Sequence, residues 1–353
     1  MMSPTAPAIR QLEPAEHRLV PALWNAAWRL RPDAVAQGQH LLTERVWRER
    51  LAKYHEDALL LGAFDGSELV GVVYGRASEA GRVAGTWQAP GVGWLSLLAV
   101  KPEWQGVGVG AALARALIGR LVARGCHSLR IASEPNHLLA GVPMSASPAM
   151  WRLARRLGAR FTAAEFDLHL DLRPDLYVPE LPEGWRISAT EPAAGLAFVQ
   201  RVFPGRWASE VADRLAAGAT IMTLLDERAA GSGAAEGFCM VYRGDEGFVA
   251  PSLAWAADLS AAADARTAGM GPLGISEEAR GQKLGLTLVA HSAAWLKERG
   301  ATDLFIDWTT LSGFYGRLGA RVWRAYHRAE IDLADLPDTS ASTSAVDAAT
   351  GGA

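Results

Sequence analysis

The hydrophobic residues of this chain follow the same pattern twice. In the first half, an apolar run over 92–100 predicts a strand, and a glycine-rich segment follows it. Leucines then recur at four-residue spacing over 113–121, which predicts a helix with one buried face. In the second half, the pattern likewise predicts a strand over 269–275 and a helix over 283–299.

Shorter segments on either side complete a similar order of elements in each half. The Asp65-Gly66 dipeptide is a strong signal for a tight turn, so it predicts a hairpin between two strands. In the first half we expect strands at 8–12, 58–64, 69–76, 128–134 and 160–172, and helices within 13–54 and at 148–157. In the second half we expect strands at 185–188, 220–225, 237–242, 303–308 and 321–333, and a helix at 312–318. This alternation indicates an α/β fold with a mixed sheet.

Short identities reinforce the repeat. The run Arg156-Leu-Gly-Ala-Arg160 recurs letter for letter as Arg317-Leu-Gly-Ala-Arg321. An Arg-Gly pair also recurs, each time nineteen residues after the polar residue that opens a glycine loop. The period of about 175 residues is far too long for a solenoid, so each copy is expected to be a whole domain.

The domain boundaries follow from composition. Three prolines interrupt the periodicity between the two copies, which predicts a first domain over 1–174, a linker over 175–183 and a second domain over 184–335. Residues 336–353 are small and polar without aromatics, so we expect a disordered tail. A length of 353 residues agrees with two domains, because it exceeds what one hydrophobic core usually supports.

The composition limits the cellular compartment and the classes of binding partner that we expect. A net charge of -3 gives no electrostatic reason to expect nucleic acid or an anionic membrane as a partner. The chain has two cysteines, its first residues lack the features of a secretory signal, and no window approaches a membrane span, so we expect a cytoplasmic protein. Eight histidines without metal-ligand spacing predict no metal site. A monomer and a homodimer both remain open.

The glycine loop over 105–110 is the clearest candidate for a binding site. Such a loop before a helix exposes consecutive backbone N–H groups, which together with the partial positive charge of the helix start favour a diphosphate. A dinucleotide fingerprint is a rival interpretation, because Gly106, Gly108 and Ala111 fit its spacing and Glu134 ends a later strand. However, a dinucleotide loop follows its strand almost directly, whereas five residues intervene after Val100, and the second copy keeps no Gly-x-Gly.

The loop contains the complete motif Q/R-x-x-G-x-G/A at Gln105, Gly108 and Gly110. In this motif and in its order of elements over 8–333, the sequence resembles the GNAT acetyltransferases. The resemblance implies two tandem GNAT domains, each with a central, mostly antiparallel sheet, a splayed strand pair and flanking helices. It also implies acetyl-CoA as the cofactor. The pantetheine would lie along Leu98, Ala99 and Val100, and the pyrophosphate along Gln105, Gly106, Val107, Gly108, Val109, Gly110 and Ala111.

The second loop is a diverged copy of this motif. Arg280 and Gly285 fit, but Lys283 takes the position of the first motif glycine. The resemblance implies that the pantetheine would lie here along Leu273, Gly274 and Ile275, and the pyrophosphate along Arg280, Gly281, Gln282, Lys283, Leu284 and Gly285.

The resemblance also implies candidates for catalysis. In the family, an acid that protonates the departing thiolate is often a tyrosine in an F-Y-x-x-x-G pattern, and Tyr315 has that place here. The alternative for Tyr315 is packing of its helix on the sheet, and the first copy has Ala154 in the same register. Asp307 lies at a strand end near the expected acetyl group of the second copy, and Glu134 and His137 lie near the equivalent place in the first, so these three are candidate bases. The alternative for a carboxylate at a strand end is that it is a solvated or helix-capping residue.

Together these features predict an enzyme, an acetyl-CoA-dependent N-acetyltransferase that acts by direct attack of a primary amine of a small-molecule acceptor. Two alternatives remain open. One is an acetyl-CoA-binding protein in which one or both halves do not catalyse. The other is a protein N-acetyltransferase.

Overall fold

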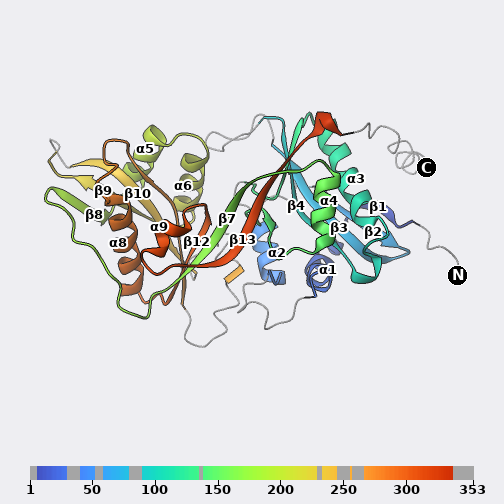
Figure 1. Ribbon diagram of the computed structural model, residues 1–353, viewed down its shortest axis with the longest axis horizontal. Helices are drawn as coiled ribbons and strands as arrows, with labels where there is room; N and C mark the ends of the chain where they lie inside the picture. Colours follow the sequence, from blue (N-terminus) through green and yellow to red (C-terminus); the bar gives the residue numbers. More distant parts are fainter. Residues whose placement is uncertain are drawn as a thin grey trace. The chain divides into compact units, whose positions relative to one another are not determined.

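The computed structural model describes residues 6–29, 40–51, 59–78, 90–134, 138–228, 233–244, 255–256 and 266–336. The chain forms two compact units (Figure 1). The first unit comprises Met1–Ala80, Ala89–Ala164 and Tyr326–Ala353, and the second comprises Gly81–Gln88 and Glu165–Ala325. Apart from residue 336, the predicted tail lies outside the described residues.

The first unit is built on a six-stranded path of paired strands, in the order β1-β2-β3-β4-β5-β13. Neighbouring strands are antiparallel except β4 and β5, which are parallel. The strands are β1 (Ala8–Gln11), β2 (Leu59–Asp65), β3 (Glu68–Ala77), β4 (Val92–Val100), β5 (Ser128–Ile131) and β13 (Arg321–Asp332), with the short β6 (Val142–Pro143) beside β13. The helices are η1 (Pro14–Leu19), α1 (Val20–Ala27), α2 (Glu44–Leu51), η4 (Pro102–Trp104), α3 (Val109–Ala123), α4 (Pro148–Arg156) and η6 (Leu333–Asp335).

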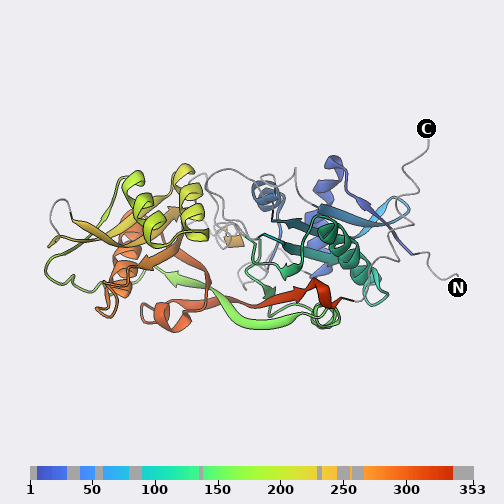
Figure 2. The same cartoon turned by 90° about the horizontal axis from the view of Figure 1, so that it is seen from above.

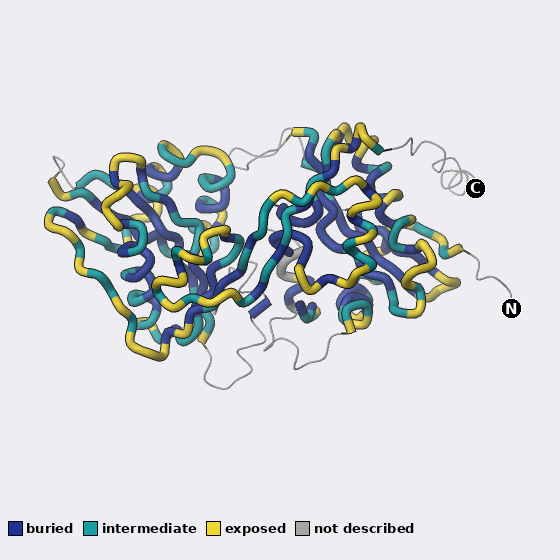
Figure 3. The backbone as a smooth tube through the Cα atoms, in the orientation of Figure 1, coloured by how far each residue is buried: buried dark blue, intermediate teal, exposed yellow. Residues whose placement is uncertain are grey.

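Helices cover both faces of this sheet, so its central strands are buried along almost their whole length (Figures 2 and 3). The α3 leucines lie over glycines of the sheet. A Cβ at Gly71 would lie 2.9 Å from Leu113, and a Cβ at Gly75 would lie 2.7 Å from Leu117. Glycine at these two positions therefore lets α3 pack closely on the strands that lead to the loop.

Strands β4 and β5 separate halfway along β4. They pair from Val92 opposite Ser128 to Leu95 opposite Ile131, and no pairing continues beyond that point. On its other edge, β4 stays paired with β3 up to Val100. Consequently, one edge of β4 after Leu95 faces a gap that β5 does not fill. This is the splayed strand pair expected from the sequence.

The second unit repeats this arrangement, in the strand order β7-β12-β11-β10-β9-β8. Among the strands that the structure describes in this unit, β11 and β12 form the parallel pair, and they also separate, because their pairing ends at Met270 opposite Ile306. The strands are β7 (Arg160–Asp171), β8 (Trp185–Ala189), β9 (Thr220–Asp226), β10 (Ala234–Arg243), β11 (Thr267–Ile275) and β12 (Asp303–Thr309). The helices are α5 (Pro192–Val202), α6 (Arg206–Ala216), α8 (Leu284–Glu298) and α9 (Ser312–Gly316).

The two halves of the chain exchange their last strands. Strand β7, from the first half, pairs with β12, with Asp171 opposite Asp303. Strand β13, from the second half, pairs with β5 in the equivalent register, with Asp332 opposite Ser128. Each compact unit therefore contains the last strand of the other half. The closing segments, expected as strands over 160–172 and 321–333, are single twelve-residue strands.

Both cysteines, Cys126 and Cys239, are buried and free. Within the described part of the chain, no helix combines the length and the apolar character needed to span a bilayer.

Candidate functional site

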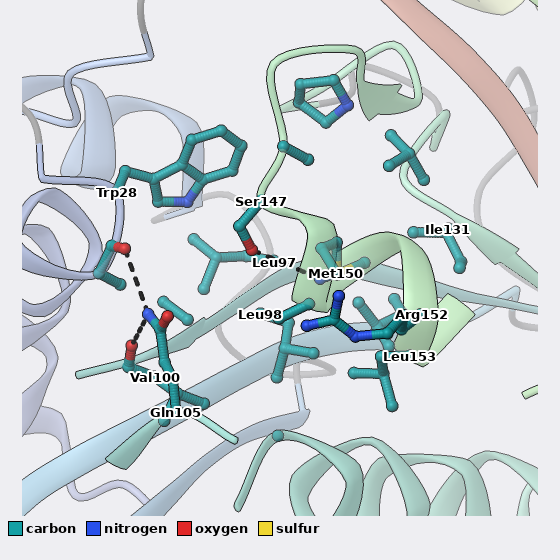
Figure 4. Close-up of a pocket in the computed structure, with 18 of the residues that line it drawn as sticks. Trp28, Leu97, Leu98, Val100, Gln105, Ile131, Ser147, Met150, Arg152 and Leu153 are labelled. Atoms are coloured by element: carbon teal, nitrogen blue, oxygen red, sulfur yellow. Dashed lines mark hydrogen bonds between the residues drawn. The ribbon is translucent and has the colours of Figure 1, made fainter. Parts of the chain in front are cut away.

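A cleft of about 610 Å³ opens in the first unit where β4 and β5 separate. Its wall consists of the free edge of β4, the glycine loop, the end of α1 and one face of α4 (Figure 4). Most of the cofactor residues expected in the first half line it, namely Leu98, Ala99, Val100, Gln105, Gly106, Gly108, Gly110 and Ala111. Of the other two, Val107 is 65% exposed and Val109 is buried in the core.

The glycine loop has a backbone shape that glycine allows. Gly106 and Gly108 both have positive φ, 82° and 100°, and Gly108 is the N-cap of α3. A Cβ at either glycine would have no heavy atom within 4 Å, so the space beside the loop is open. The first N–H groups of α3 have no partner within the helix and lie next to this space. The loop thus fits a diphosphate, which would bind to main-chain amides.

Gln105 holds the loop in place through its side chain. Its Nε2 donates to Val100 O at 2.8 Å and to Ala27 O at 3.3 Å (Figure 4). These bonds tie the loop to the end of β4 and to the end of α1. The side-chain amide of Gln105 therefore fixes the loop's position, although the residue also lines the cleft.

Glu134 is joined to the cleft through a serine. The carboxylate is 1% exposed, and its Oε2 lies 3.1 Å from Arg76 Nε in an ion pair. Ser96 Oγ donates to the same oxygen at 2.6 Å, and Ser96 lines the cleft. Because Ser96 directly follows the last β4–β5 pair, this contact lies where the strands part. His137, another residue near this point in the sequence, lies outside the described residues.

The loop of the second unit has the same backbone shape despite its different sequence. Gly281 and Lys283 have φ of 80° and 62°, and Lys283 is the N-cap of α8. A Cβ at Gly285 would lie 3.6 Å from Ile275 and 3.7 Å from Phe314. Arg280, Gly281, Gln282 and Lys283 are exposed, Leu284 and Gly274 are buried, and Leu273, Ile275 and Gly285 are half-buried.

The contacts of the last loop glycine align the two halves. A Cβ at Gly110 would lie 3.6 Å from Val100 and 3.8 Å from Leu153. These distances match those of Gly285 to Ile275 and Phe314, so Leu153 is equivalent to Phe314. The next residue in each helix is Ala154 in the first half and Tyr315 in the second, as the sequence register predicts.

Tyr315 is buried in the core of the second unit. Its ring packs against Phe314, with centroids 4.9 Å apart, and the residue is 7% exposed. Burial raises the pKa of the Tyr315 phenol, and nearby Cys239 and Asp307 raise it further. The Tyr315 phenol is therefore a weaker acid than the phenol of an ordinary, exposed tyrosine.

Asp307 belongs to a charged group around the splayed strands of the second unit. Its Oδ2 is buried and accepts no hydrogen bond from any residue that the structure describes. Arg214 of α6 donates to the carbonyl of Gly271, the first residue of β11 beyond the last pair with β12. Burial acts to lower the pKa of Arg214, but Tyr242, Asp307 and Glu210 together raise it above its ordinary value. Thus, Arg214 stays charged near the Asp307 carboxylate.

Several cleft residues were not predicted from the sequence. Trp28 and Ser96 line the cleft, as do the α4 arginines Arg152 and Arg156. The four-residue spacing of the two arginines on a predicted helix could have indicated them, because it places both side chains on one helix face. The structure also brings together no group of three or more His, Cys, Asp or Glu side chains able to hold a metal ion, within the part of the chain that it describes.

Residues 20–141 match the model of the acetyltransferase (GNAT) family. The match includes β4, the glycine loop and α3, so it confirms the resemblance that the loop motif indicated. It supports acyl transfer as the general class of reaction. No curated protein sequence matched the chain.

Solved structures similar to the chain show that its fold is that of tandem GNAT proteins. One is the GCN5-related glucosamine N-acetyltransferase region of a fungal multi-domain GH3 β-N-acetylglucosaminidase, with a TM-score of 0.74 and 24% identity; the match covers 94% of this chain and 38% of that one. Another is a GCN5-related N-acetyltransferase from Sphaerobacter thermophilus, with a TM-score of 0.61 and 18% identity; the match covers 92% of this chain and 95% of that one. A third is a tandem GNAT protein from the clavulanic acid biosynthesis pathway, with a TM-score of 0.61 and 15% identity; the match covers 94% of this chain and 99% of that one.

Proposed function

We propose that the first unit binds acetyl-CoA in the cleft between β4 and β5 and transfers the acetyl group to a primary amine of a small-molecule acceptor. The observation that carries the proposal is the open space beside Gly106 and Gly108, at the start of α3 and within the segment that matches the GNAT family. Acetyl-CoA would supply an activated acetyl thioester.

The cofactor would be held mainly by main-chain groups. The loop amides from Gly106 to Ala111 would bind the diphosphate, because they precede or begin α3. The pantetheine would lie along Leu98, Ala99 and Val100, where β5 has left one edge of β4 free. An exposed strand edge offers N–H and C=O groups to an extended partner, and pantetheine has amides that can use them.

The side chains at the point where β4 and β5 separate would accept the proton of the attacking amine. An amine attacks only in its neutral form, so a nearby group has to accept a proton. Ser96 lines the cleft and its Oγ donates to Glu134, which leaves the lone pairs of the hydroxyl to accept from an amine or a water. Glu134 is thus the proposed proton acceptor, acting through Ser96, and Arg76 compensates its buried charge.

The proposal extends to the second unit. The φ angles of Gly281 and Lys283 are positive, like those of the first loop, which supports a second acetyl-CoA loop over Arg280–Gly285. The pantetheine would lie along Leu273, Gly274 and Ile275. There Tyr315 is the proposed acid for the departing thiolate, because it directly follows Phe314, which lies beside Gly285 of the second loop. Asp307, with its unbonded Oδ2, is the proposed base.

Two measurements test this function. Calorimetric titration with acetyl-CoA should give saturable binding, with one or two sites per chain according to how many loops bind. Release of free thiol should then depend on an added amine, and glucosamine is the first acceptor to test because a similar structure is described as acting on it.

The outcomes separate the alternatives. Binding without thiol release for any pooled amine would favour a non-catalytic acetyl-CoA-binding protein. Release with peptides but not with small amines would favour a protein N-acetyltransferase. An absence of acetyl-CoA binding would reject the proposed function.

A further inference from the structure

The side chains that line the cleft have an unbalanced charge. Among the residues that the structure describes, they include three arginines, Arg29, Arg152 and Arg156, and no aspartate, glutamate or lysine. The guanidinium group of arginine stays charged at neutral pH because of its very high pKa. A group of arginines attracts an anion to the part of the cleft that it lines.

Two of these arginines form an unusual pair on α4. Arg152 and Arg156 are four residues apart, so they lie on the same helix face, where like charges repel. Neither has an ion-pair partner among the described residues, whereas Arg76, in the same unit, is paired with Glu134. An anionic ligand would remove this repulsion.

The pair lies beside the glycine loop. Leu153, between the two arginines in sequence, would lie 3.8 Å from a Cβ at Gly110 in the first turn of α3. Figure 4 shows the Arg152 side chain projecting from α4 among the residues that line the cleft. The loop amides already provide for a diphosphate, so the pair is available for a further phosphate. A guanidinium binds a phosphate through two parallel hydrogen bonds, which makes arginine well suited to this group.

Coenzyme A has one further phosphate, at the 3′ position of its ribose. Resting on the proposed function, we propose that Arg152 and Arg156 bind this 3′-phosphate, so that the cleft distinguishes coenzyme A from 3′-dephospho-coenzyme A. The pair is specific to the first half. With Leu153 equivalent to Phe314, the corresponding residues of the second half are Gly313 and Arg317, so that half has one arginine in place of two.

Calorimetric titration of the full chain with coenzyme A and with its 3′-dephospho form tests the proposal, since neither ligand can turn over. The wild-type chain should bind coenzyme A at least roughly tenfold more tightly, because the 3′-phosphate would make charge-assisted hydrogen bonds that the dephospho form lacks. The double variant Arg152→Gln and Arg156→Gln should bind both ligands alike, near the wild-type affinity for the dephospho form.

Arg155→Gln is the matched control. Arg155 is exposed on the same last turn of α4 but does not line the cleft, so this variant loses a similar helix charge and should keep the preference for coenzyme A. A wild-type chain that binds both ligands equally, or a double variant that keeps the preference, would overturn the proposal and leave the proposed function intact. If neither ligand binds the wild-type chain, both proposals fail.

Discussion

Gly108 and Lys283 occupy equivalent positions, each as the left-handed N-cap of the helix that follows a splayed strand. Their φ angles are 100° and 62°. The backbone of the loop is thus kept in both halves, although the glycine that makes this shape easy is present in only one. A lysine in this conformation costs about 1–2 kcal/mol, so the second loop keeps its shape against a local strain.

Replacing Lys283 with glycine should relieve that strain. We expect the free energy of unfolding of the second unit to rise by up to about 1 kcal/mol, because the relief exceeds the extra chain entropy of glycine in the unfolded state. Urea denaturation of the Lys283→Gly variant measures this. The variant should also bind acetyl-CoA at the second loop at least as tightly as the wild type. A loss of stability would show that the lysine side chain makes a contact worth more than the strain.

Gly108→Val makes the opposite change in the first loop. A β-branched residue at positive φ is strained by about 1–2 kcal/mol, and its side chain would enter the open space beside the loop. We therefore expect weaker acetyl-CoA binding at the first site, measured by calorimetry. The control is Gly119→Ala within α3, where no heavy atom lies within 4 Å of a Cβ. This variant should gain about 1 kcal/mol of stability and bind normally. Unchanged affinity in Gly108→Val would reject the placement of the diphosphate.

Ser96→Ala tests the route to the buried carboxylate. This variant removes the hydroxyl that joins Glu134 to the cleft and leaves the ion pair with Arg76 in place. In a chain that also carries Tyr315→Phe, so that turnover comes from the first unit, kcat should fall by roughly 10²-fold or more if the route accepts the amine proton, whereas the KM for acetyl-CoA should change little. Thiol-release kinetics measure both. A full-rate variant would limit Ser96 and Glu134 to a structural role.

The sequence predicted some parts of this site and not others, for physical reasons. Strand β4 has the predicted bounds, because a continuous apolar run between turn residues is a local signal. The loop shape at Gly106 and Gly108 is also local, since positive φ favours glycine. By contrast, the pairing of Glu134 with Arg76 joins residues fifty-eight positions apart, and no sequence period specifies it. The exchange of β7 and β13 was missed for the same reason, because strand pairing depends on which edge is free in the folded sheet.

Tyr315→Phe tests the acid in the second unit, in a chain that also carries Gly108→Val so that turnover comes from the second loop. Loss of the phenol should lower kcat by roughly 10²-fold or more and leave acetyl-CoA affinity nearly intact. The buried phenol has a raised pKa, so with Tyr315 present the alkaline loss of turnover should begin only above the usual tyrosine value of about 10. If the double variant turns over as fast as Gly108→Val alone, Tyr315 serves only to pack α9.

The strand exchange makes a prediction about stability across the two halves. Ile331, on β13, is 1% exposed, pairs with Leu129 of β5 and belongs to the core of the first unit. Ile331→Ala should therefore cost about 2–5 kcal/mol in the unit that contains the first loop, although the residue lies in the second half of the sequence. Leu170, which pairs with Leu304 in the equivalent register, provides the matched variant Leu170→Ala in the second unit. Hydrogen exchange of the β4 and β11 amides reports on each unit separately: Ile331→Ala should speed exchange in β4 and Leu170→Ala in β11. The reverse pattern would mean that each half folds with its own last strand.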